Sequence, residues 1–424
     1  MEQHRVFAAA LELTPPWQVV DVTFDNEAGE GARRGHLFLR LDFPPGSRFP
    51  CPECAQPCAV HDTHPRRWRH LDFWQHETYL EARVPRTTCK EHGVRSVPVP
   101  WGRERGGFTL LLEAFVMVLA REMPLRPLAR VLGVHDTRLW RVVKANVERA
   151  RQRVDMSEVV SLVVDETSRA KGQQYVTLFV EPGKKAARVL YVASGRDHAT
   201  FDHFATDLAA HGGDATQVRD VCMDMSAAFR KGVETTMPKA EITYDRFHVM
   251  KLAGEAVDEV RRAEQMQTPV LKGTRYAWLK NPQNLTAEQY ATMVHLNEMN
   301  LATMKAYHMR LNLAMTWTAD CAATARSALG EWRTWVHRAS RRGKDGKPTL
   351  LESMARVART VKEHLRGILN YFRKRMTSGV IEGLNSFIQA ARARARGYRS
   401  PETFKTMIYL IAGRLKFDLP MMDR

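Results

Sequence analysis

The sequence has few cysteines, few acidic residues for its number of basic ones, and no long apolar segment. Only 6 of its 424 residues are cysteine, too few for the disulfide framework of a secreted protein of this size. No run of 18 or more apolar residues occurs, and the N-terminal residues lack the apolar centre of a signal peptide. These absences exclude a membrane-spanning protein and predict a soluble intracellular one.

Basic residues dominate the charge of the chain. It has 64 Lys and Arg against 47 Asp and Glu, a formal net charge of +17, and a pI near 9.8. Such an excess favours a polyanionic partner, because neutralised phosphates release their counterions. Nucleic acid is the expected partner, since an anionic membrane would call for an apolar anchor that the sequence lacks.

The chain divides into five segments without an internal repeat or a low-complexity tract. Residues 1–100 have the short strands of a small metal-binding module, and residues 101–153 have the outline of a helix-turn-helix. Residues 154–262 are expected to form three strands, a helix, a strand, a helix and a strand. Residues 263–375 are predicted to be helical throughout, and residues 376–424 are helical and rich in arginine. The predicted fold class is therefore multidomain α/β.

Four cysteines are clustered between positions 51 and 89. Cys51 and Cys54 form a CxxC pair, and Cys89 with His92 forms a second pair of the same spacing. Two such pairs suit the tetrahedral coordination of a structural Zn²⁺, which would leave no open position for catalysis. The alternatives are reduced free cysteines, or replacement of one ligand by a neighbouring side chain. The candidates for that replacement are Cys58, His61 and His64.

Three acidic residues stand where carboxylates from separate segments would converge. Asp165 ends the apolar run VVSLVV, so we expect it at the C-terminal edge of a buried strand, and Asp224 follows VRDVCM in the same way. Glu382 lies in a helix whose apolar stripe would dock on the sheet. Two-metal phosphoryl transfer needs such convergence, because the two cations lie about 3.5–4 Å apart. The residues of that stripe are Ile381, Leu384 and Ile388.

Each of these acidic residues also has a structural interpretation. An Asp after an apolar strand is commonly a turn or helix-capping residue, and a helical Glu is commonly just solvated. The order of strand Asp, strand Asp and late helical Glu, on a basic chain with a metal module, favours the catalytic interpretation.

The segment that follows residue 106 predicts a DNA reader. Leu128, Val131 and Leu132 are expected to face the core, and the second helix begins near Asp136. An ordinary helical hairpin gives the same pattern, so the reading surface is a hypothesis. The side chains expected to face DNA are Thr137, Arg138, Arg141 and Lys144.

These motifs together resemble the ISL3 group of DDE transposases along nearly the whole chain. Asp165 in VVDET, Asp224 in VCMDMS and Glu382 in SGVIEGLNS match the three acidic residues of that family in order. The stretch YDRFHV, which contains Asp245, Arg246 and His248, also matches, as do Asn385 and the closing GYRSPETFK. The family usually has a cysteine where this chain has His92, a departure that zinc chemistry tolerates.

The resemblance implies a ribonuclease H-like core, split by the helical segment and preceded by the zinc module and the helix-turn-helix. It implies DNA cleavage and strand transfer with Mg²⁺ or Mn²⁺ held by the three acidic residues. The expected partners are double-stranded transposon ends and target DNA, with a homodimer to hold two ends, in the prokaryotic cytoplasm. His248 and Asn385 are possible supports of the active site. Phosphate contacts are expected from Arg392, Arg394 and Arg396.

The helical segment accounts for the 158 residues between Asp224 and Glu382. Its tryptophans would either stack on unpaired bases or anchor the core of a helical bundle, the latter being more usual. Two other functions remain open. One is a catalytically silent DNA-binding regulator, which retention of all three acidic residues disfavours, and the other is a hydrolytic nuclease of the same fold. The tryptophans concerned are Trp278, Trp317, Trp332 and Trp335.

Overall fold

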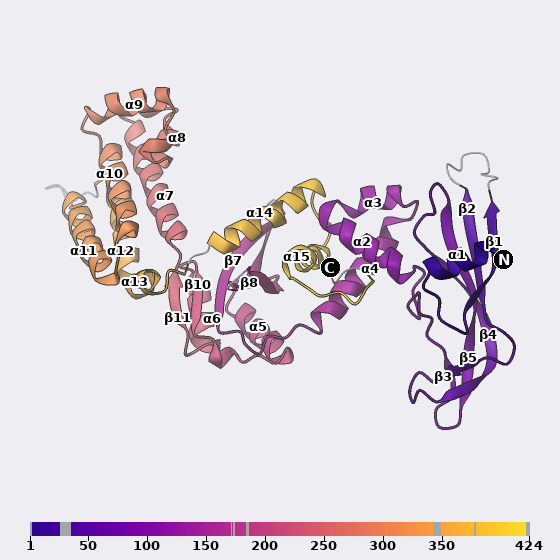
Figure 1. The fold of residues 1–424 in the computed structure, drawn as a ribbon. Helices are drawn as coiled ribbons and strands as arrows, with labels where there is room; N and C mark the ends of the chain where they lie inside the picture. The colour runs from indigo at the N-terminus through magenta and orange to yellow at the C-terminus, as the bar shows by residue number, and fades with distance from the viewer. Residues whose placement is uncertain are drawn as a thin grey trace. The chain divides into compact units, whose positions relative to one another are not determined.

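A computed structural model describes residues 2–25, 35–170, 172, 174–183, 186–341, 349–376 and 379–420. The chain forms two compact units, one of Met1–Arg151 with Leu415–Arg424 and one of Gln152–Arg414 (Figure 1). None of the described helices is long and apolar enough to cross a membrane.

The first unit contains a twisted sheet with the strand order β1-β2-β5-β4-β3, and β6 pairs with β5. Strands β2 and β5 are parallel, and the other pairs are antiparallel. Strands β4 and β5 are long and carry alternating buried and exposed residues. The bounds are α1 (Glu2–Ala10), β1 (Gln18–Asp25), β2 (His36–Asp42), β3 (Arg48–Pro50), β4 (Pro57–Arg69), β5 (Glu77–Cys89) and β6 (Gly93–Ser96).

Aromatic side chains fill the core beneath this sheet. Trp17 makes edge contacts with Phe43 and with Trp101, whose ring centroids lie 5.4 and 4.9 Å from its own. Trp68, fully buried, packs against Trp101 at 5.7 Å. Burying rings of this size supplies much of the stability of so small a module.

Three helices follow in the first unit: α2 (Leu110–Glu122), α3 (Leu125–Val131) and α4 (Asp136–Arg151). Gly133 has φ +66° in the turn between α3 and α4, a conformation that favours glycine. Leu128 and Leu132 face the core as predicted, but the prediction for Val131 is wrong, because its side chain is 53% exposed. The buried face of α3 follows Leu125, Leu128 and Leu132, and Val131 lies off that stripe.

The second unit is built on a five-stranded sheet of order β11-β10-β7-β8-β9. Strand β8 is antiparallel to both neighbours, whereas β10 is parallel to β7 and to β11. The predicted order of three strands, a helix, a strand, a helix and a strand is confirmed. The bounds are β7 (Ser161–Ala170), β8 (Gln174–Glu181), β9 (Arg188–Ala193), α5 (Ala199–Ala210), β10 (Asp220–Met223), α6 (Ala227–Thr236) and β11 (Glu241–Tyr244).

Helices pack on this sheet through a continuous apolar core. On α5, Phe204 stacks on Phe179 of β8 at 4.3 Å, and Phe201 makes an edge contact with Phe229 of α6. Helix α15 (Pro401–Ala412) is tied to the sheet by Tyr409, whose hydroxyl accepts a hydrogen bond from Val192 N at 3.0 Å. Helix α14 (Gly379–Arg394) packs on β7.

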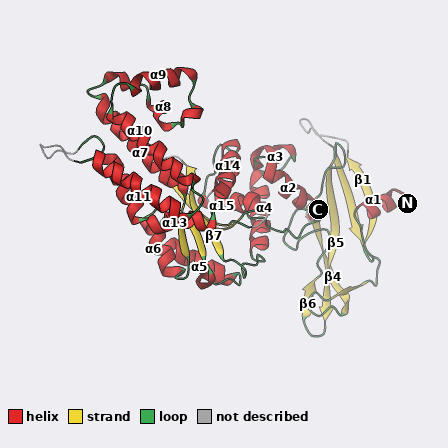
Figure 2. Cartoon of the chain, turned by 60° about the vertical axis from the view of Figure 1, so that its left-hand side comes forward, coloured by secondary structure: helices red, strands yellow, loops and turns green. Residues whose placement is uncertain are grey.

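The segment between β11 and α14 contains no strand among its described residues, as predicted (Figure 2). Trp278, Trp317 and Trp332 are buried core residues, which confirms the structural interpretation for these three, whereas Trp335 is 39% exposed. The helices are α7 (Arg246–Gln265), α8 (Arg275–Leu279), α9 (Ala287–Asn297), α10 (Ala302–Met315), α11 (Ala322–Ala339), α12 (Glu352–Glu363) and α13 (Leu365–Lys374).

Candidate functional site

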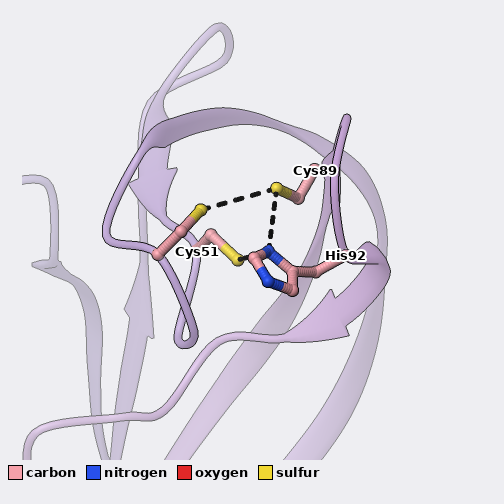
Figure 3. A group of neighbouring side chains, drawn as sticks. Cys51, Cys89 and His92 are labelled. Carbon is pink, nitrogen blue, oxygen red and sulfur yellow. Dashed lines mark hydrogen bonds between the residues drawn. The ribbon is translucent and has the colours of Figure 1, made fainter.

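The first candidate site is a cluster of three cysteines and a histidine in the first unit. Ligand atoms of Cys51, Cys54, Cys89 and His92 all lie within 4.8 Å of one another. The Cys54 and Cys89 sulfurs are 3.6 Å apart, and Nδ1 of His92 lies 3.5 Å from the Cys89 sulfur and 3.8 Å from that of Cys51 (Figure 3). A zinc–sulfur bond of about 2.3 Å predicts a tetrahedron edge of about 3.8 Å. The four residues therefore fit a zinc ion.

The sheet explains how the two pairs meet. Cys51 follows β3, Cys89 ends β5, and His92 lies in the short turn before β6, where Gly93 has φ +69°. The second ring nitrogen of His92, Nε2, lies 3.5 Å from the carboxylate of Glu53. A carboxylate in this position orients the ring of many zinc-binding histidines. Hydrogen bonds from the backbone and ring of His92 lower the pKa of Cys89 to about 6, so the thiolate is accessible for metal binding. Cys58 is outside the cluster, and its sulfur lies 3.2 Å from the Gln56 carbonyl oxygen.

The second candidate site lies in the second unit, at the C-terminal end of strand β10. Residues of β10 pair with β7 from Asp220↔Ser161 to Cys222↔Val163, and with β11 up to Met223↔Tyr244. Continuing this register places Asp165 of β7 in one row with Asp224 and Asp245, which directly follow β10 and β11. The prediction that Asp165 ends its strand is wrong, because β7 continues to Ala170. Beyond Val164 that strand keeps its antiparallel partner β8, so Asp165 still lies where the parallel ladder stops.

The row of aspartates concentrates negative charge at partly buried positions. The pKa of Asp165 is raised to about 6, mainly by burial and in part by the charges of Asp224 and Asp245, although a hydrogen bond from Glu166 N and the nearby His248 act to lower it. Among the described residues, neither Asp165 nor Asp224 pairs with a Lys or Arg. The Nε2 atom of His248 lies 3.8 Å from Oδ1 of Asp165, and this pair is ionic only when the imidazole is protonated. A cation from solution would stabilise such a row.

Helix α14 brings the C-terminal part of the chain to this edge. Asn385 donates from Nδ2 to Oδ2 of Asp165 at 3.3 Å, and Gln389 donates to Oγ1 of Thr167 and to the Ser168 carbonyl, each at 2.8 Å. Ile381 and Ile388 of the predicted stripe are fully buried, whereas Leu384 is only partly buried. The sequence therefore positions α14 through an apolar stripe bordered by amides.

Glu382 is exposed in the first turn of α14, one turn before Asn385. Among the described residues, its carboxylate does not join Asp165 and Asp224 in a group tight enough to hold a metal. The structure thus brings Asp165, Asp224, His248 and Asn385 together and leaves Glu382 at the rim.

A third candidate site is a groove on the helix-turn-helix, with a volume of about 620 Å³. The prediction that Arg138 faces outward holds only in part. Its side chain is partly buried, and its guanidinium lies over the Phe108 ring at 4.4 Å. Thr137, Arg141 and Lys144 are exposed as predicted. The loop before α2 adds Arg103 and Arg105, which the sequence interpretation missed.

An acidic residue lies at the base of this groove but does not cancel its charge. Glu113 is 4% exposed and accepts hydrogen bonds from Arg103 Nε and Asn146 Nδ2, each at 3.1 Å. Arg105 and Arg141, which are exposed, have no acidic partner among the described residues. The groove therefore presents uncompensated cations along α4, as phosphate binding requires.

Comparison with known proteins identifies the family. A family model described as a transposase of the ISL3 type matches residues 162–408, more than half of the chain. The chain belongs to the ISL3 family of transposases. Models of this family's zinc finger and helix-turn-helix domain match residues 47–92 and 97–145, which contain the zinc cluster and most of α4. The helix-turn-helix implies DNA binding, and the zinc-finger match supports a structural zinc.

Curated relatives carry the same assignment over their full length. The chain is 29% identical over 407 residues to the transposase for insertion sequence element IS1001 of Bordetella parapertussis, covering 93% of this chain and 95% of the relative. It is 27% identical over 456 residues to the transposase for insertion sequence element IS1557 of Mycobacterium tuberculosis, covering 99% and 98%. This ISL3 family member is thus an insertion-sequence transposase with a DDE transposase domain.

Asn385 provides a test of the site geometry. If Asp165 holds a catalytic metal ion, Asn385→Ala should weaken strand transfer by about 10- to 100-fold, the usual cost of losing a group that orients a metal ligand. It should also raise the Mg²⁺ concentration needed for half-maximal joining. Ser386→Ala, at the next position with a hydroxyl bonded only to the Glu382 carbonyl oxygen within the helix, is the control. Equal Mg²⁺ dependence in both variants would contradict this role for Asn385.

Proposed function

We propose that this transposase cuts the ends of its insertion sequence and joins them to target DNA by a two-metal mechanism, in which Asp165, Asp224 and Glu382 hold Mg²⁺ or Mn²⁺. The observation that supports it most is the register that aligns Asp165 with Asp224 at the end of the parallel ladder. The metal ions would activate the attacking oxygen and stabilise the leaving oxygen. The sheet would then correspond to the ribonuclease H-like core, with α8–α13 in its predicted helical insertion.

The side chains around Asp165 suit that role. Asn385 donates to one oxygen of Asp165, and its own Oδ1 is a buried atom without a hydrogen-bond partner in the described part of the chain. Burial of an unsatisfied amide oxygen is costly, so the site is suited to a further polar group such as a metal-bound water. Glu382 would complete the site by a shift of the exposed first turn of α14.

The net positive charge and the order of the domains support double-stranded DNA as the substrate. This DNA would comprise the transposon ends and the target. We propose that α4 contacts the DNA of the transposon end through Thr137, Arg141 and Lys144, with Arg138 packed on Phe108 beside them. Arg392 is less available for phosphate than predicted, because it donates to the Ser168 carbonyl and to Gln389. Arg394 and Arg396 remain predicted phosphate contacts.

A homodimer that holds two ends remains a proposal that rests on the task of joining two ends. Residence in the prokaryotic cytoplasm remains a proposal that rests on the proposed action on DNA. The predicted segments 1–100, 101–153, 154–262, 263–375 and 376–424 likewise remain a proposed domain division.

The groove on the helix-turn-helix predicts a salt effect. Arg141→Ala should reduce the slope of log affinity against log salt by about 0.9, the contribution of one phosphate contact, and should weaken specific and nonspecific duplexes alike. Arg130→Ala, which removes an exposed arginine of α3 outside the groove, is the matched control. Fluorescence anisotropy over a range of salt concentrations measures both. An unchanged slope for Arg141→Ala would exclude it from the phosphate interface.

Strand transfer by the intact protein, and its loss in Asp165→Asn, Asp224→Asn and Glu382→Gln, test the catalytic proposal.

A further inference from the structure

A groove runs along one face of helix α7. It begins near the row of aspartates, at Phe247, and extends along the helix toward its C-terminal end. Its volume is about 630 Å³, within the range of pockets that hold small organic groups. The α7 residues that line it recur at helical spacing, so they form one continuous stripe that begins in the first turn of the helix. The first two turns and their continuation contribute Phe247, Met250, Lys251, Gly254 and Glu255 to this stripe.

Phe247 stands at the end of the groove nearest to the aspartates. Its side chain is 55% exposed, and its ring meets that of His248 edge to face, with centroids 5.7 Å apart. His248 in turn places Nε2 3.8 Å from Oδ1 of Asp165. The backbone holds this arrangement, because Phe247 N donates to the capping carboxylate of Asp245 at 3.1 Å. His248 thus lies between the exposed ring of Phe247 and the carboxylate of Asp165, and it contacts both.

The middle of the groove is open because residue 254 is glycine. A Cβ there would lie 3.7 Å from Leu279 Cδ2 and 4.0 Å from Arg310 Nε, which are ordinary contacts. A larger side chain would therefore occupy the groove rather than break the helix. Met250 and Leu279 give this part of the groove an apolar lining.

The charges favour an anion at the Phe247 end. Lys251, one turn from Phe247, is exposed and has no acidic partner in the described part of the chain. Farther along, Asp258 is neutralised by arginines that include Arg262 and Arg275. Glu255 is an exposed carboxylate one turn beyond Lys251, so repulsion confines a phosphate to the first two turns of α7.

We propose that this end of the groove binds one unpaired nucleotide of the DNA strand next to the cleavage site. Its base would stack on the exposed side of Phe247 and its phosphate would pair with Lys251. A base inside a duplex already stacks on its neighbours, so the ring is available only to a base that has left the helix. This inference rests on the proposed function, because it places DNA at the aspartate row. It adds a base-binding site that would hold the strand open during cleavage.

The test uses duplexes that carry the terminal repeat of the element encoding the chain, with 2-aminopurine at positions flanking the cleavage site. With Ca²⁺ in place of Mg²⁺, the intact protein should quench or shift the fluorescence at one flanking position, and Phe247→Ala should lose that signal. In Mg²⁺, Phe247→Ala should join paired ends about tenfold more slowly, the scale of one lost base stack. Joining should recover to within about threefold on ends whose flanking base pair is opened by a mismatch.

Matched variants separate base stacking from other effects. Phe247→Trp should keep near-normal joining, and Gly254→Leu, which fills the groove, should reproduce the defect of Phe247→Ala. Phe387→Ala, which removes an exposed aromatic side chain from α14 outside the groove, should not.

Two results would overturn the inference. One is an equal defect of Phe247→Ala on paired and opened ends, and the other is a changed molecular mass of that variant without DNA, which would make Phe247 a contact between copies. Failure of the intact protein to join any end would instead contradict the proposed function. The Ca²⁺ fluorescence signal needs no chemistry, so the two failures are distinguishable.

Discussion

Asp224→Asn should lower strand transfer by about a thousandfold or more while leaving DNA binding unchanged. Loss of one metal-holding carboxylate removes several kcal/mol of transition-state stabilisation, and each 1.4 kcal/mol is about a factor of ten in rate. Asparagine keeps the acceptor that Ser226 N uses at 2.9 Å, so the start of α6 should remain intact. Joining of a labelled transposon end to plasmid, followed on gels, measures the effect beside anisotropy for binding.

Asp220→Asn is the matched control, because Asp220 begins the same strand and its carboxylate pairs with Lys374 away from the aspartate row. It should join ends at close to the normal rate. Asp165→Asn and Glu382→Gln should match Asp224→Asn. If Glu382→Gln alone kept full activity, the assignment of the third metal-holding residue would be wrong, although the two strand aspartates would stand.

Cys89→Ser should release the zinc ion and unfold the module around it. Cys89 joins the end of β5 to the turn before β6 and contacts both Cys54 and His92. Structural zinc supplies about 10 kcal/mol or more of folding free energy in small zinc modules, more than the net stability of most domains. The zinc content measured by metal analysis should fall from about one ion per chain to almost none. Limited proteolysis should then cleave within the first hundred residues.

Cys58→Ser provides the control for the zinc prediction. Cys58 is buried beside the same cluster, but its sulfur faces the Gln56 carbonyl oxygen, where a hydroxyl also donates. This variant should keep its zinc. Zinc retained by Cys89→Ser and lost by Cys58→Ser would show that the fourth ligand differs from the one that the geometry indicates.

The order of strands and helices in the second unit could be predicted from sequence, because the spacing of its apolar residues changes abruptly from one element to the next. The apolar runs before Asp165 and Asp224 are buried on both faces, as the inner strands of a covered sheet must be. The length of β7 could not be predicted in the same way. Its second half is polar and pairs with β8 alone, so the end of the apolar run marks the end of the parallel ladder rather than of the strand.

The members of the candidate site were predictable to different degrees. Asp165 and Asp224 follow apolar strands, and this local signal identifies them. The part played by Gln389 depends on which face of α14 meets β7, a long-range contact across more than 200 residues that no local pattern encodes. Asp245 was recognised only within a matching motif, whereas its place in the aspartate row comes from the pairing of β10 with β11.

The DNA reader shows the same limit. Leu128 and Leu132 were predictable from helical spacing, but Val131 was not, because α3 is short and its buried stripe is set by Leu125. Arg138 was predicted to face solvent from its position on α4. The structure places it on Phe108, a residue of the loop before α2, and no sequence pattern indicates where that loop folds back.

The central claim is that this chain joins DNA ends by metal-dependent chemistry at the aspartate row. The most direct measurement is the incubation of the intact protein with a labelled duplex of its element's terminal repeat and a plasmid target, with Mg²⁺, with Mn²⁺ and without divalent metal. We predict covalent end-to-plasmid product with either metal and none without. Tight binding with neither cleavage nor joining under both metals would contradict the account and identify a DNA-binding protein without catalytic activity.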